Sequence, residues 1–151
     1  MAYSSPTEYA YFDTSALIRR YVNEPGRREV LQLLRKKRCV VSAVLPVEIG
    51  SALRRRLTEG GLDQADVAAI LKRFTADRAF WTVIDVSREV LVAAESLSAA
   101  HPLRALDAIH MASAQLFAAR GSSAALTFVS ADLRQTSLAA VLRMNVRHIQ
   151  S

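Results

Sequence analysis

Four acidic residues of this chain, Asp13, Glu48, Asp107 and Asp132, each lie where a strand or loop is expected to pass into a helix. Asp13 and Asp132 follow apolar stretches that are typical of strands, whereas Glu48 and Asp107 fall early in segments with helical periodicity. A parallel sheet gathers the carboxyl ends of its strands along one edge, so we expect the four carboxylates to lie together there. Such carboxylates repel one another unless a cation or shared protons compensate, and hard oxygen ligands suit Mg²⁺ or Mn²⁺. The four acids therefore predict a metal-dependent phosphodiesterase.

Each acid also has a simpler interpretation when it is taken alone. Asp13 and Asp132 could be N-caps of the helices that follow them. Glu48 and Asp107 could be first-turn acids that complement a helix dipole. The occurrence of all four at such positions in one chain favours a common site.

The overall charge points to a polyanionic partner. The chain has 151 residues, a formal net charge of +6 and a sequence pI near 10.1. A basic protein with acids gathered at one site fits a nuclease, because arginines can hold phosphates while carboxylates hold the metal. A basic surface that serves only solubility is the alternative.

The remaining composition favours an ordinary globular protein of the cytoplasm. Its length suits one domain over 1–151. Cys39 is the only cysteine, which excludes a disulfide framework and a thiolate metal cluster. No apolar run approaches the ~18 residues of a membrane span, and the first eight residues lack the features of a signal peptide. We therefore expect no membrane association and a cytoplasmic location.

The acids must be positioned by alternating strands and helices, which predict a three-layer α/β/α fold with a mainly parallel central sheet. Strands are expected at 9–12, 38–42, 80–86, 126–130 and 146–149. Helices are expected at 15–21, at 27–37, from a Ser42 cap to 59, from an Asp63 cap, from Ser87 to about 101, at about 103–120, and after the fourth strand through 144.

Four blocks of the sequence, 11–18, 47–53, 106–114 and 128–132, carry the four acids at intervals of 35, 59 and 25 residues. Together they resemble the acidic blocks of PIN-domain nucleases, and most closely those of the VapC-type toxins of bacterial toxin–antitoxin pairs. Two positions depart from the pattern. Ser130 stands where many relatives carry another polar or acidic residue, and a glycine that is common late in such chains is absent. We expect Asn145 to take the left-handed turn there instead.

The resemblance implies a Mg²⁺-dependent endoribonuclease, with Mn²⁺ as a substitute, that a cognate antitoxin holds inactive and that forms a homodimer. The four acids would be the catalytic metal ligands, and the Thr14 and Ser130 hydroxyls would orient carboxylates or waters. A water on the metal would attack the scissile phosphorus of RNA, with no histidine base required. The alternatives are a housekeeping PIN-type RNA-processing nuclease without an antitoxin and a nonenzymatic RNA-binding module.

Basic and aromatic residues near these blocks are candidates for further roles. At least one of Arg54, Arg55 and Arg56 is a candidate phosphate contact, because arginine recognises phosphate with paired donors. His110 lies one helical turn after Asp107, either as a ligand or proton donor or as a helix histidine that bonds a neighbour. Trp81 is expected in the core.

Overall fold

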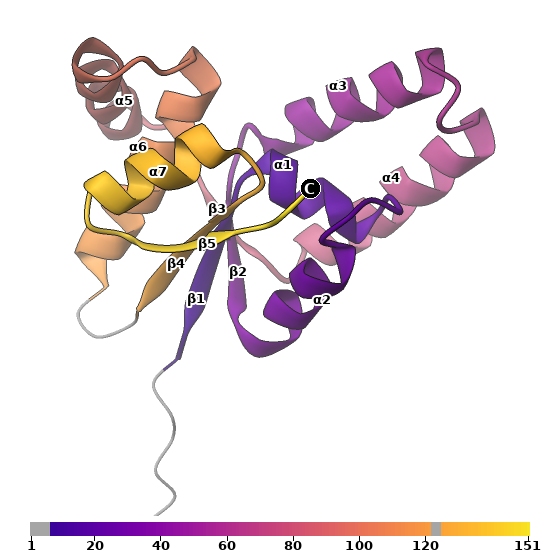
Figure 1. The fold of residues 1–151 in the computed structure, drawn as a ribbon, viewed down its shortest axis with the longest axis horizontal. Coiled ribbons are helices and arrows are strands. Elements are labelled where there is room, and N and C mark those ends of the chain that lie inside the picture. The colour runs from indigo at the N-terminus through magenta and orange to yellow at the C-terminus, as the bar shows by residue number, and fades with distance from the viewer. Residues whose placement is uncertain (1–6, 122–124) are drawn as a thin grey trace, which may run out of the picture.

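The computed structural model describes residues 7–121 and 125–151, in which strands and helices alternate along the chain (Figure 1). The strands are β1 (Tyr9–Phe12), β2 (Arg38–Ser42), β3 (Thr82–Ile84), β4 (Leu126–Ser130) and β5 (Asn145–His148). The helices are α1 (Thr14–Leu17), the 3₁₀ helix η1 (Ile18–Arg20), α2 (Arg27–Lys36), α3 (Leu45–Thr58), α4 (Gln64–Arg78), α5 (Arg88–Ala100), α6 (Ala105–Arg120) and α7 (Leu133–Val141).

The described strands form one five-stranded sheet in the order β3-β2-β1-β4-β5, and every neighbouring pair is parallel. The chain builds outward from β1 through β2 to β3, and then returns to the other side of β1 with β4 and β5. The strand order therefore reverses between β1 and β4. In open α/β sheets, ligands bind outside the carboxyl ends of the strands at this kind of reversal.

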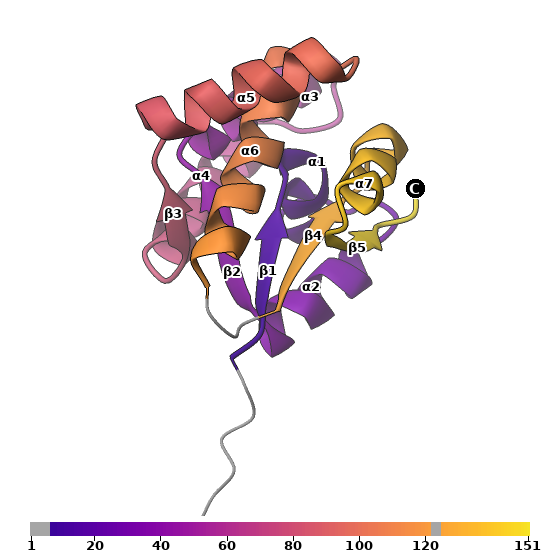
Figure 2. The same cartoon turned by 90° about the vertical axis from the view of Figure 1, so that its left-hand side faces the viewer.

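Helices cover both faces of the sheet, which confirms the predicted three-layer α/β/α architecture (Figures 1 and 2). In β1, Ala10 and Phe12 belong to a core shared with α1, α2, α3 and Phe74 of α4. Tyr11 of the same strand faces a second core that contains Met111 of α6 and residues of α7. Side chains of one strand thus enter both cores, as expected for a parallel strand buried on both faces.

Local sequence signals account for several helix starts. Asp63 caps α4 and forms a reciprocal capping box with Asp66. Ser87 caps α5 through a bond from the backbone N–H of Val90. The predicted Ser42 cap is wrong, because α3 begins after Val44, although Ser42 Oγ does accept a bond from the Val44 N–H.

Three predictions differ from the structure near the ends of elements. The strand predicted at 80–86 is only β3, because Phe80 and Trp81 lie in the turn that follows α4. The helix predicted to run through 144 ends at Val141. The left-handed residue in the turn after it is Arg143, at φ 61°, and not Asn145, which begins β5.

Within residues 7–121 and 125–151, no helix is both long and apolar enough to span a bilayer. The prediction about a signal peptide concerns mainly residues 1–6, which lie outside the described residues.

Candidate active site

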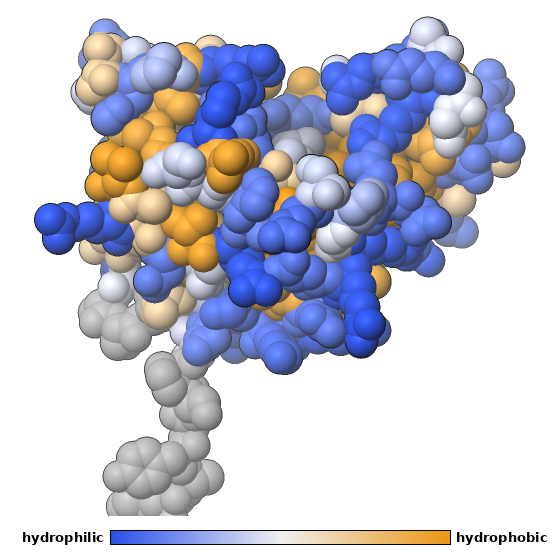
Figure 3. Space-filling view, in the orientation of Figure 1, coloured by the Kyte–Doolittle hydropathy of each residue, from blue (hydrophilic) through white to orange (hydrophobic). Residues whose placement is uncertain are grey.

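All four predicted acids line one pocket of about 590 Å³ at the carboxyl end of the sheet. Asp13 directly follows β1 and Asp132 follows β4, the two strands between which the order reverses. Glu48 lies in the first turn of α3 and Asp107 in the first turn of α6. Helices α3 and α4 project to one side of this edge and α5, α6 and α7 to the other, with a notch between them in the surface (Figures 1 and 3).

Asp13 is the most deeply buried of these acids, with 2% of its surface exposed. Its Oδ1 accepts a bond of 2.8 Å from Ser15 Oγ and one of 3.2 Å from the backbone N of Ala16, so Asp13 is also the N-cap of α1. Its Oδ2 accepts bonds of 3.0 Å from Ser130 Oγ and from Gln135 Nε2. Burial raises the pKa of the Asp13 carboxyl, and the opposing effects of His110 and of the bonds from Ser15, Ser130 and the Ala16 backbone offset this rise only in part.

Glu48 is held by a chain of hydrogen bonds that reaches into the core. Its Oε1 accepts a bond of 2.8 Å from Thr14 Oγ1 and lies 2.5 Å from Nε2 of His110. The other ring nitrogen of His110, Nδ1, lies 2.8 Å from the hydroxyl of the fully buried Tyr11. Burial raises the pKa of Glu48 and lowers that of His110. The hydrogen bond and the charge attraction between the two, with smaller effects of other neighbours, together outweigh burial, so the net pKa of Glu48 is lowered and that of His110 is raised. With both ring nitrogens engaged, His110 is placed to orient Glu48.

Asp107 is partly exposed, and its Oδ1 accepts a bond of 3.0 Å from the same Gln135 Nε2 that contacts Asp13. Burial and repulsion from Asp132 raise the pKa of the Asp107 carboxyl. This direction is the one expected when carboxylates share a pocket without enough positive charge between them.

Asp132 is turned toward solvent and toward Arg134. Its two oxygens accept bonds of 3.2 and 2.8 Å from the Arg134 guanidinium, and Oδ1 also accepts the Arg134 backbone N–H as the N-cap of α7. These bonds, with the guanidinium bond the strongest, lower the pKa of Asp132 against the opposing effect of burial. The capping interpretation therefore applies to Asp13 and Asp132 in addition to their place in the pocket.

Two polar residues that contact the acids were missed in the sequence. Ser15 Oγ bonds to Asp13 and accepts the backbone N–H of Ala131, which ties α1 to the end of β4. Gln135 bonds to two of the acids. The available signal was proximity, because Ser15 lies two residues after Asp13 and Gln135 three residues after Asp132.

The three predicted arginines differ in their surroundings. Arg55 is exposed and lines the pocket. Arg56 also lines it but is bound to Glu24, with its Nη2 2.5 Å from Oε1. Arg54 is exposed and is not among the described residues that form the pocket wall. Arg104, just before α6, adds a second exposed guanidinium to the lining.

The carboxylate oxygens of this pocket are suitable ligands for a divalent cation, although they do not surround one point on all sides. Among the described residues, no group of three or more acidic, histidine or cysteine side chains is close enough to hold a metal ion. Asp13 and Asp107, however, approach one common polar atom to 3.0 Å each. Mg²⁺ needs only one or two carboxylates because it keeps several waters. These two carboxylates are therefore the pair best placed to share an ion.

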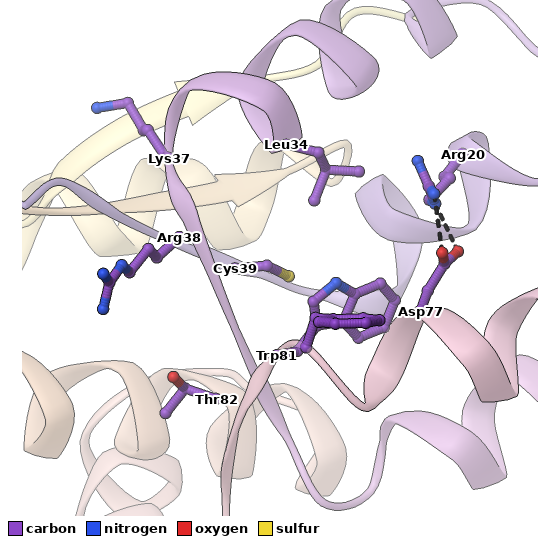
Figure 4. Close-up of a pocket in the computed structure, with 9 residues that line it drawn as sticks. Arg20, Leu34, Lys37, Arg38, Cys39, Asp77, Trp81 and Thr82 are labelled. Atoms are coloured by element: carbon purple, nitrogen blue, oxygen red, sulfur yellow. Dashed lines mark hydrogen bonds and ion pairs between the residues drawn. The ribbon is translucent and has the colours of Figure 1, made fainter.

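A second pocket of about 430 Å³, at the opposite end of the sheet, has different chemistry (Figure 4). Its carboxylate, Asp77, pairs with Arg20 at 2.7 Å and accepts the hydroxyl of Tyr21. The buried Cys39 belongs to the core cluster beside it, and the partly buried Trp81 packs against that cluster, as expected for Trp81. Because its carboxylate is already paired with a guanidinium, this pocket is a poorer candidate for a metal site than the pocket of the four acids.

Comparison with known proteins gives a matching family and a set of similar solved structures, among them the two that follow. The PIN domain family model matches residues 10–141. A toxin–antitoxin complex from Klebsiella pneumoniae is 20% identical with a TM-score of 0.62, over 85% of this chain and 90% of that one. PAE2754 from Pyrobaculum aerophilum is 17% identical with a TM-score of 0.64, over 90% of this chain and 84% of that one. No curated protein sequence matches the chain significantly.

The family match extends from β1 to the end of α7 and includes all four acids, whereas β5 lies beyond it. The two similar structures have the same fold over most of their length. The chain belongs to the PIN domain family.

Proposed function

We propose that this protein is a metal-dependent endoribonuclease and the toxin of a toxin–antitoxin pair. The observation that carries the nuclease proposal is the pocket at the reversal of strand order, which Asp13, Glu48, Asp107 and Asp132 all line. PIN domains are generally nucleases, and the net charge of +6 supports a polyanionic substrate. RNA is the substrate that we propose, and Mg²⁺ or Mn²⁺ is the cofactor.

In this proposal Asp13 and Asp107 would hold the cation directly, and Glu48 and Asp132 would contact it through bound water. When bound, the cation acidifies a water for attack on the phosphorus and stabilises charge on the leaving oxygen. Thr14 and His110 hold the Glu48 carboxylate in place through its Oε1. Ser130 holds Asp13 through Oδ2. These residues keep the carboxylates oriented before the substrate arrives.

Arg55 and Arg104 are placed to hold RNA phosphates at the mouth of the pocket. Both are exposed and both line it. Arg56 contributes less to substrate binding, because its guanidinium is already paired with Glu24. A planar guanidinium can donate two parallel bonds to one phosphate, which positions the strand over the carboxylates.

Support for the toxin proposal comes from the similar Klebsiella pneumoniae structure, which is a toxin–antitoxin complex. Three exposed apolar side chains, Val47, Leu106 and Leu133, each stand next to one of the acids along the chain. An antitoxin segment that combines a basic residue with apolar neighbours would complement that rim. We further propose one PIN-like domain over 1–151, a homodimer and a cytoplasmic location.

Replacement of single acids tests the nuclease proposal. Asp13→Asn and Asp107→Asn should each abolish metal-dependent RNA cleavage, because an amide is a poor ligand for Mg²⁺. Mn²⁺ should raise the melting temperature of the unaltered protein, since binding to the folded state alone stabilises it. This rise should shrink in both variants. Asp85→Asn, at an exposed position after β3, is the matched control and should keep cleavage and the response to Mn²⁺.

Metal-dependent cleavage that persists in both variants would contradict the site assignment. RNA binding without cleavage at any metal concentration would favour the nonenzymatic module. Co-expression with the neighbouring gene tests the toxin proposal, and a stable complex with reduced cleavage is the expected result. If the active nuclease is tolerated by cells without any partner, the housekeeping alternative replaces the toxin proposal.

A further inference from the structure

The side-chain amide of Gln135 lies between two of the four acids. Gln135 occupies the first turn of α7 and is only 4% exposed. Its Nε2 lies 3.0 Å from Oδ2 of Asp13 and 3.0 Å from Oδ1 of Asp107. An amide NH₂ has two hydrogens, so one group can donate to both carboxylates at once.

The other end of the same amide is unsatisfied. Among the described residues, Oε1 of Gln135 is buried and has no hydrogen-bond partner. A buried acceptor without a partner is unfavourable, and most buried polar atoms in proteins avoid that state. The Gln135 side chain is therefore held by the bonds from its nitrogen to Asp13 and Asp107, at the expense of its oxygen.

The position of Nε2 is also the position that a shared cation requires. An ion anchored by Asp13 and Asp107 must approach both carboxylates from between them. Gln135 Nε2 presents the positive end of an amide dipole at that place. The two arrangements exclude each other, because an ion and the NH₂ group cannot contact the same two oxygen atoms from the same side.

We propose that Gln135 is a built-in competitor of the divalent cation, which must displace its amide from Asp13 and Asp107 to bind there. This inference rests on the proposed metal site. It gives Gln135 a positioning role: its amide holds the two carboxylates together when no ion does so. The cost of breaking two hydrogen bonds to charged acceptors then weakens the apparent affinity for the ion.

Two substitutions at this position separate competition from simple packing. Gln135→Met keeps a straight side chain of similar size but cannot donate a hydrogen bond. Gln135→Glu keeps the shape and replaces the donor by a third carboxylate. The same changes at Gln32, an exposed residue in the middle of α2, are the matched controls. Mn²⁺ binding is measured by titration calorimetry, and melting temperatures are measured in EDTA and in Mn²⁺.

For Gln135→Met we expect Mn²⁺ to bind about tenfold more tightly, which corresponds to about 1.4 kcal/mol. Its melting temperature in EDTA should be lower, since the two carboxylates lose their common donor. Gln135→Glu should show the largest rise in melting temperature between EDTA and Mn²⁺. Both Gln32 variants should bind Mn²⁺ with unchanged affinity.

The outcomes distinguish this inference from the proposed function. If the unaltered protein binds Mn²⁺ and both Gln135 variants bind it with the same affinity as the unaltered protein, Gln135 serves only packing. The inference then fails, while the proposed metal site stands. Weaker binding in Gln135→Met would mean that Gln135 supports the ion, which also overturns competition. If Mn²⁺ does not bind the unaltered protein, the proposed metal site fails and this inference fails with it.

Discussion

Removal of one buried hydroxyl should test how much the core supports the acidic pocket. Tyr11 is fully buried, and its hydroxyl lies 2.8 Å from Nδ1 of His110, which is 1% exposed. In Tyr11→Phe, that nitrogen loses its partner in a place that water does not reach. An unsatisfied buried polar group costs about 1–3 kcal/mol. Tyr11→Phe should therefore lower the free energy of unfolding whether Nδ1 accepts the bond or donates it.

Tyr9→Phe is the matched control, because it makes the same chemical change two residues earlier in β1. Tyr9 packs edge-on against Phe117, with ring centroids 5.2 Å apart. Its hydroxyl makes no hydrogen bond to another described residue. We therefore expect Tyr9→Phe to change the free energy of unfolding by no more than about 0.5 kcal/mol.

Urea and thermal unfolding in EDTA measure the difference between the two variants. For a protein of this size, each kcal/mol lost should lower the melting temperature by about 2–4 °C. In a His110→Leu background, the same Tyr11→Phe change should cost much less, with a coupling energy of about 0.5–3 kcal/mol. If Tyr11→Phe is as stable as Tyr9→Phe, the contact contributes no net stability and the reasoning is refuted.

Three further predictions concern backbone, charge and substrate. Gly26→Ala should destabilise far more than Gly60→Ala in urea unfolding: both have φ near 80°, but only at Gly26 would a Cβ collide with a neighbouring side chain, that of Ile149. Hydrogen bonds outweigh burial and lower the pKa of Asp77 below 3.8, so Asp77→Asn should be less stable than the unaltered protein at pH 7. This stability difference should begin to shrink as the pH falls below about 4, where the carboxyl of the unfolded chain takes up a proton, and should close once the folded carboxyl is protonated as well. Arg55→Ala should reduce the log–log salt slope of single-stranded RNA binding by about 0.7, with Arg54→Ala as the unchanged control.

The sequence predicted the buried central strands of this fold better than the exposed ends of its other elements. The bounds of β1, β2 and β4 match the prediction, because strands buried on both faces are short apolar runs bounded by polar residues. The strand predicted from Phe80 was too long: Phe80 is 90% exposed, and strand propensity does not show whether a residue is covered. The left-handed turn at Arg143 was assigned to Asn145, because an arginine in that conformation has no sequence signal.

The candidate site was predictable where its residues directly follow strands or begin helices. The position of Asp13 after β1 and of Asp132 after β4 could be read from apolar runs alone. The contacts of Gln135 could not, because they depend on where the first turn of α7 lies relative to β1 and α6. The bond of His110 to Glu48 joins residues 62 positions apart and likewise depends on helix packing.

The position of β1 in the middle of the sheet has a consequence for the order of events during translation. Asp13 is synthesised 117 residues before its partner Ser130 and 122 residues before its partner Gln135. At a synthesis rate of about 5–20 residues per second, roughly 6 to 24 s separate Asp13 from Gln135. During that interval β2 can pair with β1, while the other edge of β1 must wait for β4. A nascent chain therefore has no complete acidic pocket until Gln135 has been added and α7 has begun to fold against β1 and α6.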